Sequence, residues 1–322
     1  MRQYTHVVTG AAGFIGRNVV EALNARGDTR LLLVDELGRS EKWKNLVGLR
    51  YEDIWHPSRF RQAFRDNTLP DGILSVIHLG ACSATTETDA DYLLDNNYAY
   101  TRELCQWCLD QGVRFVYASS AATYGDGALG YSDDDDKTPL YRPLNMYGYS
   151  KHMFDLWALE NNLFARIAGL KYFNVYGPYE DHKDDMRSVV HKSHQQIRAG
   201  GNVKLFRSHR PDYRDGEQLR DFIYVKDAVA VTLWLADRVR PSGLFNCGTG
   251  EARSWLDLAR AVYAALGRVP EIEFIDMPAT LQPKYQYYTK ADMGKLRAAG
   301  YDRPFTSLED GVRDYVRGYL GV

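Results

Sequence analysis

The sequence contains no long uninterrupted hydrophobic run. No stretch approaches the eighteen or more apolar residues that a membrane-spanning helix needs, and the N-terminal segment MRQYTHVVTG has no apolar core behind a charged leader. These absences predict a soluble, cytoplasmic protein with no membrane partner.

An excess of one charge is also lacking, and cysteine is scarce. The 322 residues include 40 Lys and Arg against 42 Asp and Glu, so a formal net charge of -2 gives no general attraction to nucleic acid. The four cysteines, Cys82, Cys105, Cys108 and Cys247, are too few and too scattered for a disulfide framework. The CxxC pair Cys105 and Cys108 lies in a helical pattern, so we expect it to pack in a core, and we expect no metal site.

Short apolar runs do occur, and they alternate with amphipathic segments over the first 175 residues. The runs are THVVTG, RLLLVDE, SVIHLGA, RFVYASS and GLKYFNVYG. This alternation is typical of βαβ units and predicts an α/β fold with a Rossmann-type, doubly wound parallel sheet. After Gly177 a polar, charge-rich region follows, and the tail holds two helical patterns, SWLDLARAVYAALG and TKADMGKLRAAG, around a predicted strand, EIEFIDM. We predict a nucleotide-binding domain at 1–173 and 222–246, and a smaller, mostly C-terminal substrate-binding domain at 174–221 and 247–322.

The segment GAAGFIG, at Gly10–Gly16, directly follows the first predicted strand and opens a helix. Glycines there allow a tight turn and let backbone N–H groups approach a pyrophosphate, which predicts a dinucleotide site. Asp35 ends the second predicted strand, where a carboxylate binds a ribose hydroxyl and favours NAD. Arg39 and Lys42 follow closely and could supply the positive charge that the 2′-phosphate of NADP requires. These residues leave both cofactors open.

A tyrosine and a lysine stand close together in LNMYGYSKHMF. Tyr147 lies four residues before Lys151, hence on the same helical face, whereas Tyr149 does not. The nearby ammonium group is expected to lower the pKa of the Tyr147 phenol from its usual value of about 10, which makes Tyr147 a candidate acid or base. Ser120, in YASSAATYG, is expected at the carboxyl edge of the sheet, where it could hydrogen-bond an alcohol or ketone oxygen.

Together, GAAGFIG, YASSAATYG and MYGYSK resemble the extended short-chain dehydrogenase/reductase superfamily, whose members rework nucleotide-activated sugars. Dehydratases of that superfamily carry an Asp-Glu pair after the serine, whereas this chain has Ala121, Ala122 and Thr123, which favours an epimerase or a simple oxidoreductase. The blocks GACSATTETD, LLDNNYAYTRELC, KYFNVYGPYEDHK and LRAAGYDRPF are similar to the ADP-glyceromanno-heptose 6-epimerase family. That resemblance implies an isomerase with tightly bound NADP. It would remove a hydride from C6″ of ADP-D-glycero-D-manno-heptose and return it to the opposite face, making the L-glycero precursor of the lipopolysaccharide core.

The same resemblance implies roles for individual residues. Tyr147 and Lys183 would handle the proton in the two epimers, with Ser120 and Lys151 beside Tyr147. Arg220 would clamp the diphosphate through charge-assisted hydrogen bonds. With the glycine turn and its neighbours, the expected cofactor contacts are Gly10, Gly13, Phe14, Ile15, Gly16, Asp35, Glu36, Arg39, Lys42, Leu79, Gly80, Ala81, Cys82, Ser83, Asn96, Lys151, Val175 and Lys183. The expected substrate contacts are Ser120, Asn174, Asp185, Lys192, Phe206, Arg207, Ser208, His209, Arg220 and Tyr285.

Some positions depart from the family pattern. The departures are Asp185 in place of a serine, Lys192 in place of a histidine, Pro57 in place of a lysine, Leu79 in place of an acid, and the insertion RPDYRDGEQ before Arg220. They leave the sugar, its nucleotide and the choice between NADP and NAD open, so a UDP-hexose 4-epimerase and a GDP-heptose epimerase stay as alternatives. A non-catalytic dinucleotide sensor is a third, which the retained Ser120, Tyr147 and Lys151 disfavour. The family also implies a homo-oligomer, often a pentamer.

Overall fold

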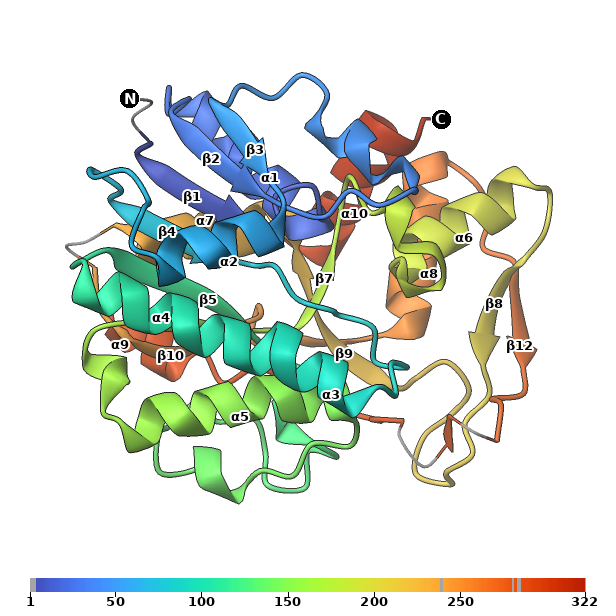
Figure 1. The fold of residues 1–322 in the computed structure, drawn as a ribbon. Helices are drawn as coiled ribbons and strands as arrows, with labels where there is room; N and C mark the ends of the chain where they lie inside the picture. Colours follow the sequence, from blue (N-terminus) through green and yellow to red (C-terminus); the bar gives the residue numbers. More distant parts are fainter. Residues whose placement is uncertain (1–3, 238–239, 280, 283–284, 322) are drawn as a thin grey trace. The chain divides into compact units, whose positions relative to one another are not determined.

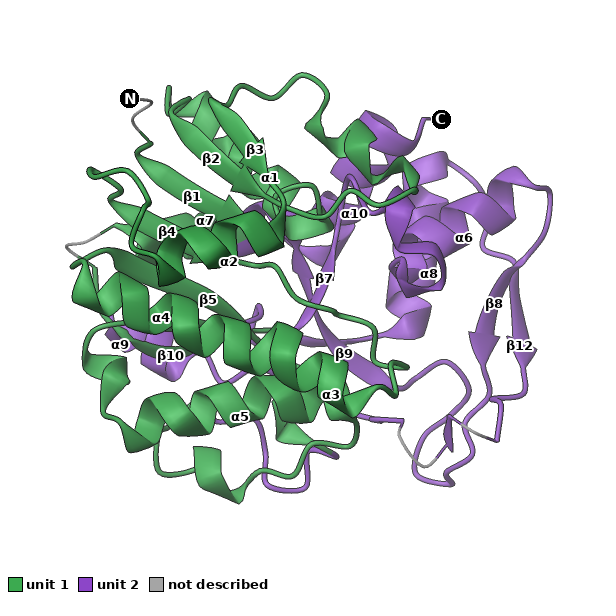
Figure 2. Ribbon diagram, in the orientation of Figure 1, with its two compact units in different colours: residues 1–125, 133–172, 229–245 green, residues 126–132, 173–228, 246–322 purple. Residues whose placement is uncertain are grey.

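The computed structural model describes residues 4–237, 240–279, 281–282 and 285–321, in two compact units (Figure 2). Unit 1 comprises residues 1–125, 133–172 and 229–245, and unit 2 comprises residues 126–132, 173–228 and 246–322. Over the described ranges, no helix combines the length and the hydrophobicity needed to cross a bilayer.

A seven-stranded sheet forms the centre of unit 1 (Figure 1). Its strands, in sheet order, are β10 (Gly243–Cys247), β6 (Ala168–Tyr172), β5 (Arg114–Ser120), β4 (Ser75–His78), β1 (His6–Thr9), β2 (Leu31–Val34) and β3 (Asp53–Trp55). The neighbouring strands from β6 to β3 are all parallel. The predicted α/β fold class is therefore confirmed, although the short, half-buried β3 was not predicted. GLKYFNVYG is also divided, because Phe173 separates β6 from the next strand.

Helices cover both faces of this sheet. Figure 1 shows α2 (Pro57–Arg65), α4 (Tyr100–Asp110) and α5 (Met146–Glu160) on one face, with α1 (Phe14–Ala25) and α7 (Val225–Ala236) behind. On the first face, Phe60, Leu104 and Phe154 join one buried apolar cluster with the strands. A short helix, α3 (Ala90–Leu93), continues through a π-helical segment, Leu94–Ala99, into α4. Cys105 and Cys108 are free and buried in α4, and burial raises the pKa of both thiols, so they pack as core residues.

Unit 2 contains a three-stranded and a two-stranded sheet. The first consists of β7 (Asn174–Tyr176), β9 (Leu219–Tyr224) and β11 (Ala252–Ser254), and the second pairs β8 (Val203–Phe206) with β12 (Ile272–Ile275). Its helices include α6 (Val189–Arg198), α8 (Trp255–Leu266), α9 (Gly294–Ala298) and α10 (Leu308–Tyr315). The helix α9 is shorter than the TKADMGKLRAAG pattern predicts. Thr289 N donates to the carbonyl of Leu219, and Ala291 N donates to Asp221, so this backbone is engaged with β9.

A fully buried ion pair fixes α5 to the sheet. Nζ of Lys171, on β6, lies 3.2 Å from Oδ2 of Asp155, on α5, and both side chains are 0% exposed. Asp155 also accepts hydrogen bonds from the hydroxyls of Tyr117 and Ser119, each at 2.7 Å. Lys171 donates to Oγ1 of Thr123 at 2.6 Å. Each charge therefore has partners besides the opposite charge, as a buried pair requires to offset desolvation.

We predict that removing either charge of this pair destabilises unit 1 strongly. Lys171→Met leaves the Asp155 carboxylate buried without its cation, and it should lower the free energy of unfolding by about 3–5 kcal/mol. Combining Lys171→Met with Asp155→Asn should restore part of this loss, because no buried charge is then uncompensated. Denaturant unfolding of wild type, both single variants and the double variant measures the coupling. Additive single effects would contradict the prediction.

Candidate active site

The glycine turn of unit 1 leaves no room for a Cβ atom at Gly10 or Gly16. Gly10 has a φ of +67°, and a Cβ there would lie 2.8 Å from the backbone nitrogen of Gly80. A Cβ on Gly16 would lie 2.0 Å from the carbonyl oxygen of Gly10. The helix α1 begins after Gly13 without a side-chain cap on its first N–H groups. This close-packed cradle at a helix N-terminus fits the pyrophosphate of a dinucleotide.

Asp35 lies at the end of β2 and is 7% exposed. Its Oδ2 accepts the backbone N–H of Ala12 at 2.7 Å, and its Oδ1 accepts the N–H of Glu36 at 2.8 Å. Lys42 forms an ion pair with the same carboxylate, at 2.5 Å, and Arg39 is exposed. The Asp35 carboxylate is thus held beside the glycine turn, next to the Lys42 ammonium group. This cation partly neutralises the repulsion between Asp35 and a phosphate.

The segment Leu79–Ser83, another expected cofactor contact, is held by an asparagine that the sequence did not indicate. Asn97 accepts the N–H of Cys82 and donates to the carbonyl of Cys82, both at 2.9 Å. The predicted residue, Asn96, donates to Oδ1 of Asn97 at 3.0 Å. The two adjacent asparagines in LLDNNYAYT were the only sequence feature that pointed to this role. The buried one, Asn97, is the residue that orders the loop.

Ser120, Tyr147 and Lys151 come together in unit 1. Ser120 ends β5, and Asn145 caps α5 by accepting the N–H of Gly148 at 2.8 Å, which places Tyr147 in the first turn of the helix. The Ser120 hydroxyl lies close enough to the Tyr147 phenol to act on its pKa. Lys151 follows one helical turn later and is 5% exposed, whereas Tyr149 is 47% exposed.

The predicted direction of the Tyr147 pKa shift is wrong for this structure. Burial raises the pKa of Tyr147, and the nearby Ser120 hydroxyl opposes this shift only in part. The desolvation of a phenolate outweighs local stabilisation here, which helical spacing alone cannot reveal. Burial also lowers the pKa of Lys151 to about 8, against a weaker opposing effect of Asp155.

Lys183 lies in a short 3₁₀ segment of unit 2, Asp181–Met186, and is half-buried. The preceding Glu180 is fully buried and anchors the segment: its carboxylate accepts the N–H of Ser188 at 2.6 Å and the hydroxyl of Tyr315 at 3.1 Å. Burial lowers the pKa of Lys183, and the charge of Glu180 opposes this shift. The lysine is therefore not the solvated surface residue that its polar sequence context alone would indicate.

Asp185 and Lys192, which depart from the family pattern near Lys183, are hydrogen-bonded to each other. Nζ of Lys192 donates to the backbone carbonyl of Asp185 at 2.6 Å, and the neighbouring His191 lies 2.8 Å from a carboxylate oxygen of Asp181. Asp184 adopts a φ of 44° with a ψ of -119°, a backbone conformation that is rare for a residue other than glycine. Backbone strain and side-chain bonds thus shape this segment.

Arg220, on β9, is a buried cation close to two aromatic rings. Its guanidinium carbon lies 5.6 Å from the ring centre of Trp255 and 5.0 Å from that of Tyr285, while Nε1 of Trp255 donates to the Tyr285 hydroxyl at 2.9 Å. Its hydrogen bonds go to the backbone carbonyls of Leu219 and Gln286. No carboxylate in the described part of the chain forms an ion pair with Arg220, so the site can attract an anion.

The remaining expected substrate contacts also lie in unit 2. Phe206 ends β8, and in the loop after it Ser208 N donates to Asp215 and His209 N donates to the Tyr287 hydroxyl, each at 2.8 Å. The others are Arg207, which pairs with Asp276, and Asn174, which begins β7 beside β9. Val175 and Lys183 are the two expected cofactor contacts outside unit 1. The sequence did not indicate that Trp255 would contact Arg220 or that Tyr287 would bond His209, because both contacts depend on tertiary packing.

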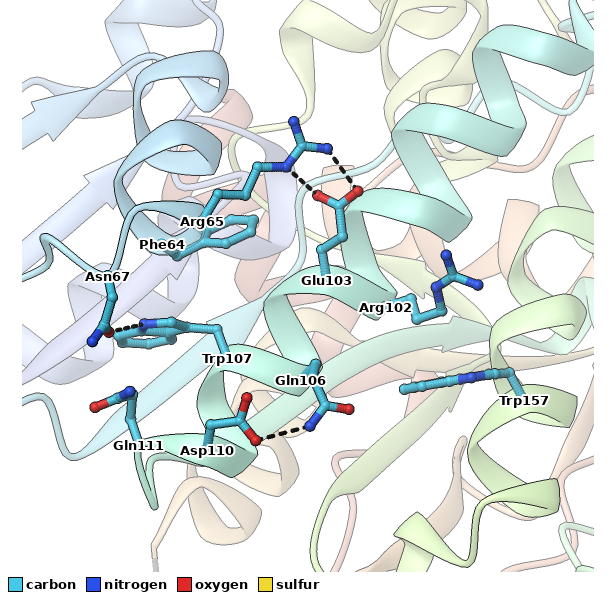
Figure 3. Close-up of a pocket in the computed structure, with 10 residues that line it drawn as sticks. All are labelled: Phe64, Arg65, Asn67, Arg102, Glu103, Gln106, Trp107, Asp110, Gln111 and Trp157. Atoms are coloured by element: carbon cyan, nitrogen blue, oxygen red, sulfur yellow. Dashed lines mark hydrogen bonds and ion pairs between the residues drawn. The ribbon is translucent and has the colours of Figure 1, made fainter.

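Figure 3 shows a pocket on α2, α4 and α5 of unit 1. Trp107 and Trp157 line it, Asn67 accepts a hydrogen bond from Nε1 of Trp107 at 3.2 Å, and Arg65 pairs with Glu103 at 2.7 Å. None of the lining residues is an expected catalytic, cofactor or substrate contact. In the described ranges, no group of three or more His, Cys, Asp or Glu side chains could hold a metal ion.

Comparison with known proteins adds to this geometry. The NAD dependent epimerase/dehydratase family matches residues 6–248. The ADP-L-glycero-D-manno-heptose-6-epimerase of Nitratidesulfovibrio vulgaris is 56% identical over 98% of both chains. The chain therefore belongs to the NAD dependent epimerase/dehydratase family.

Solved structures agree with membership of the epimerase family. The ADP-L-glycero-D-manno-heptose-6-epimerase of Helicobacter pylori superposes with a TM-score of 0.83 at 26% identity, covering 100% of this chain and 97% of that one. UDP-glucose 4-epimerase of Thermus thermophilus, solved with NAD, has a TM-score of 0.76 at 27% identity, covering 98% and 99%. The resemblance expected from the sequence is confirmed.

The lowered pKa of Lys151 predicts a pH dependence of stability in the cofactor-free protein. Between pH 8 and 10.5 the unfolded chain binds the Lys151 proton more tightly than the folded chain does, so raising the pH through this window favours folding. Relative to Lys151→Met, wild type should gain up to about 3 kcal/mol from pH 7 to pH 10.5. Denaturant unfolding at both pH values measures the difference. A constant difference would contradict a lowered pKa of Lys151 in the folded protein.

Proposed function

We propose that the chain converts ADP-D-glycero-D-manno-heptose into its L-glycero epimer at C6″, with a hydride that leaves and returns to the same carbon. The observation that carries the proposal is the cluster of Ser120, Tyr147 and Lys151 beside a dinucleotide cradle, in a chain similar over its whole length to epimerases of that name. Ala121, Ala122 and Thr123 lack the acid pair of dehydratases and agree with epimerisation.

The nicotinamide, when bound, supplies the hydride acceptor and donor. In one epimer Tyr147 takes the proton of the C6″ hydroxyl, Ser120 hydrogen-bonds the same oxygen, and the Lys151 ammonium group stabilises the phenolate. In the other epimer Lys183 handles the proton: its ammonium group gives a proton to the ketone oxygen when that alcohol forms, and its neutral amine takes the proton in the reverse direction. Burial lowers the pKa of Lys183 and so eases this loss of the proton. The substrate ketone reorients between the two steps, so one alcohol is consumed and one is formed.

We propose that Arg220 binds the diphosphate of the sugar nucleotide. A buried guanidinium group without a carboxylate partner in the described chain forms strong bidentate bonds with phosphate oxygens. The rings of Trp255 and Tyr285 lie 5.6 Å and 5.0 Å from its guanidinium carbon and contribute cation–π attraction. Asn174, Asp185, Lys192 and the loop Phe206–His209 complete the proposed substrate contacts.

For the cofactor, we propose NADP rather than NAD. Lys42 and the exposed Arg39 supply positive charge next to Asp35, which otherwise repels a 2′-phosphate. We further propose a cytoplasmic homo-oligomer, a pentamer by family resemblance, that supplies the heptose donor for the lipopolysaccharide core.

The isotope pattern of the product tests the reaction. Wild type incubated with ADP-D-glycero-D-manno-heptose in D2O should form the L-glycero epimer without deuterium at C6″, because the hydride returns directly. NMR of the purified product measures the deuterium content at C6″. Deuterium at C6″ would indicate a carbanion route, and turnover of UDP-glucose with no action on the heptose would assign a hexose epimerase.

Matched variants connect this reaction to the two proton-handling residues. Tyr147→Phe and Lys183→Ala should each lower the rate by roughly 10²–10⁴, the usual contribution of a positioned acid or base. Tyr149→Phe and Lys204→Ala, both exposed, should keep wild-type rates. Unchanged turnover in Lys183→Ala would exclude the two-residue assignment.

Lys42 provides a test of cofactor preference. Lys42→Ala should weaken NADP binding about tenfold or more and change NAD binding less than about threefold, because a charge-assisted bond to the 2′-phosphate is lost and Asp35 is left unpaired. Lys44→Ala, an exposed neighbour, is the control. Isothermal titration of both variants with both dinucleotides measures this, and equal losses for NAD and NADP would refute the preference.

A further inference from the structure

A chain of buried hydrogen bonds passes through His78, at the end of β4 in unit 1. Nδ1 of His78 lies 2.7 Å from Oγ1 of Thr9, and Nε2 lies 2.9 Å from Oγ1 of Thr101. All three side chains are 2% exposed. The catalytic steps above do not use this histidine.

The positions of the protons follow from the groups at the ends of the chain. Oγ1 of Thr101 lies 2.6 Å from the carbonyl oxygen of Asn97, which can only accept, so the single hydroxyl proton points there. His78 Nε2–H must therefore donate to Thr101, and Nδ1 must accept the proton of Thr9. Thr9 in turn accepts the N–H of Gly80 at 3.0 Å. His78 is thus a neutral imidazole with its proton on Nε2.

The charge environment agrees with a neutral ring. Burial, with a contribution from the Lys151 ammonium group, lowers the pKa of His78 to about 3. The ring is stacked 5.7 Å from Tyr100 and 6.0 Å from Phe115, centre to centre, with no carboxylate among these neighbours. The ring therefore stays neutral at any pH at which the protein is expected to work, and its hydrogen bonds to Thr9 and Thr101 set the tautomer.

One end of the chain reaches the glycine turn. Thr9 directly precedes Gly10, and a Cβ on Gly10 would lie 2.8 Å from the nitrogen of Gly80, so the two backbones are in direct contact. The Gly80 N–H that closes this contact is the one that donates to Thr9. The chain therefore sets the spacing between two cofactor-binding segments.

The other end reaches the catalytic helix. Asn97, whose carbonyl ends the His78 chain, holds both backbone polar groups of Cys82 and donates to Oγ of Ser150 at 3.0 Å. Ser150 donates to the backbone carbonyl of Tyr147 at 2.7 Å. Asn97 and Ser150 are 1% and 0% exposed, so water does not compete for these bonds.

We propose that His78 is a positioning residue that fixes the glycine turn relative to Asn97, and through Asn97 sets the loop Leu79–Ser83 and the first turn of α5. The proposal rests on the proposed function only in that these segments hold the dinucleotide and present Tyr147. A histidine that served packing alone would be replaceable by phenylalanine, which keeps the stacked ring and removes both hydrogen bonds.

His78→Phe, with His6→Phe as the matched control, separates these roles. His6 pairs with Ser75 at 2.8 Å on the same two strands, at their opposite ends. His78→Phe should lower kcat and NADP affinity at least about tenfold, because buried partners lose their bonds, with the KM for the sugar nucleotide within about threefold of wild type. His6→Phe should alter none of these more than about twofold. Wild-type kcat and NADP affinity in His78→Phe would overturn the proposal.

The tautomer provides a readout that is independent of the substrate. Two-bond proton–nitrogen NMR correlations of protein labelled with ¹⁵N-histidine should show a neutral Nε2–H ring that is absent from His78→Phe. A proton on Nδ1, or an imidazolium ion at neutral pH, would overturn the proposal even in an active enzyme. Conversely, an inactive wild type with this tautomer would overturn only the proposed function. Should His78→Phe not fold, His78→Gln, which keeps the donor to Thr101, should fold and retain intermediate NADP affinity, and unchanged affinity would again overturn the role.

Discussion

The buried pair of Asp155 and Lys171 is the constraint on which the geometry of unit 1 depends. Two charges in a dry interior need completed hydrogen bonds to offset their desolvation, so the pair favours the arrangement in which its partners reach both charges. Those partners control the active site, because Thr123, which accepts from Lys171, donates to the carbonyl of Ser120 at 2.8 Å. Asp155 stands one helical turn after Lys151. The pair therefore fixes the serine-bearing strand end against the helix that carries Tyr147.

A second buried polar network reaches the same helix from the cofactor side. Asn97 bonds Ser150 on α5, whereas Asp155 holds the helix through the hydroxyls of Tyr117 and Ser119 on β5. Apolar contacts such as those of Phe154 allow α5 to slide or rotate against the sheet at little cost in free energy. Directional hydrogen bonds at two points of α5 oppose both movements. A phenol and an alcohol that must lie within hydrogen-bonding reach of one substrate oxygen require this rigidity.

The features that the sequence predicted correctly depend on residues that are close together in the chain. The strands follow from short buried runs, the glycine turn follows from GAAGFIG, and the relation of Tyr147 to Lys151 follows from one turn of a helix. The buried networks join residues far apart in the chain, such as Lys171 with Thr123 and Asn97 with Ser150, which no local pattern connects. The Tyr147 pKa failed as a prediction for the same reason, since desolvation is a property of the folded environment. The region after Gly177 looked merely polar, yet it contains α6 and β8.

Unit 2 carries features that cost stability without an internal counterpart. Arg220 is a buried cation whose partners in the described chain are carbonyls and rings, and Asp184 holds a backbone conformation with positive φ next to Lys183. A sequence selected for stability alone would replace both, for example with an apolar residue and a glycine. Such sites persist when a bound ligand recovers the cost, and an anionic diphosphate at Arg220 meets that condition with the strongest available pairing. The destabilised positions of unit 2 thus agree with the substrate that the proposed reaction requires.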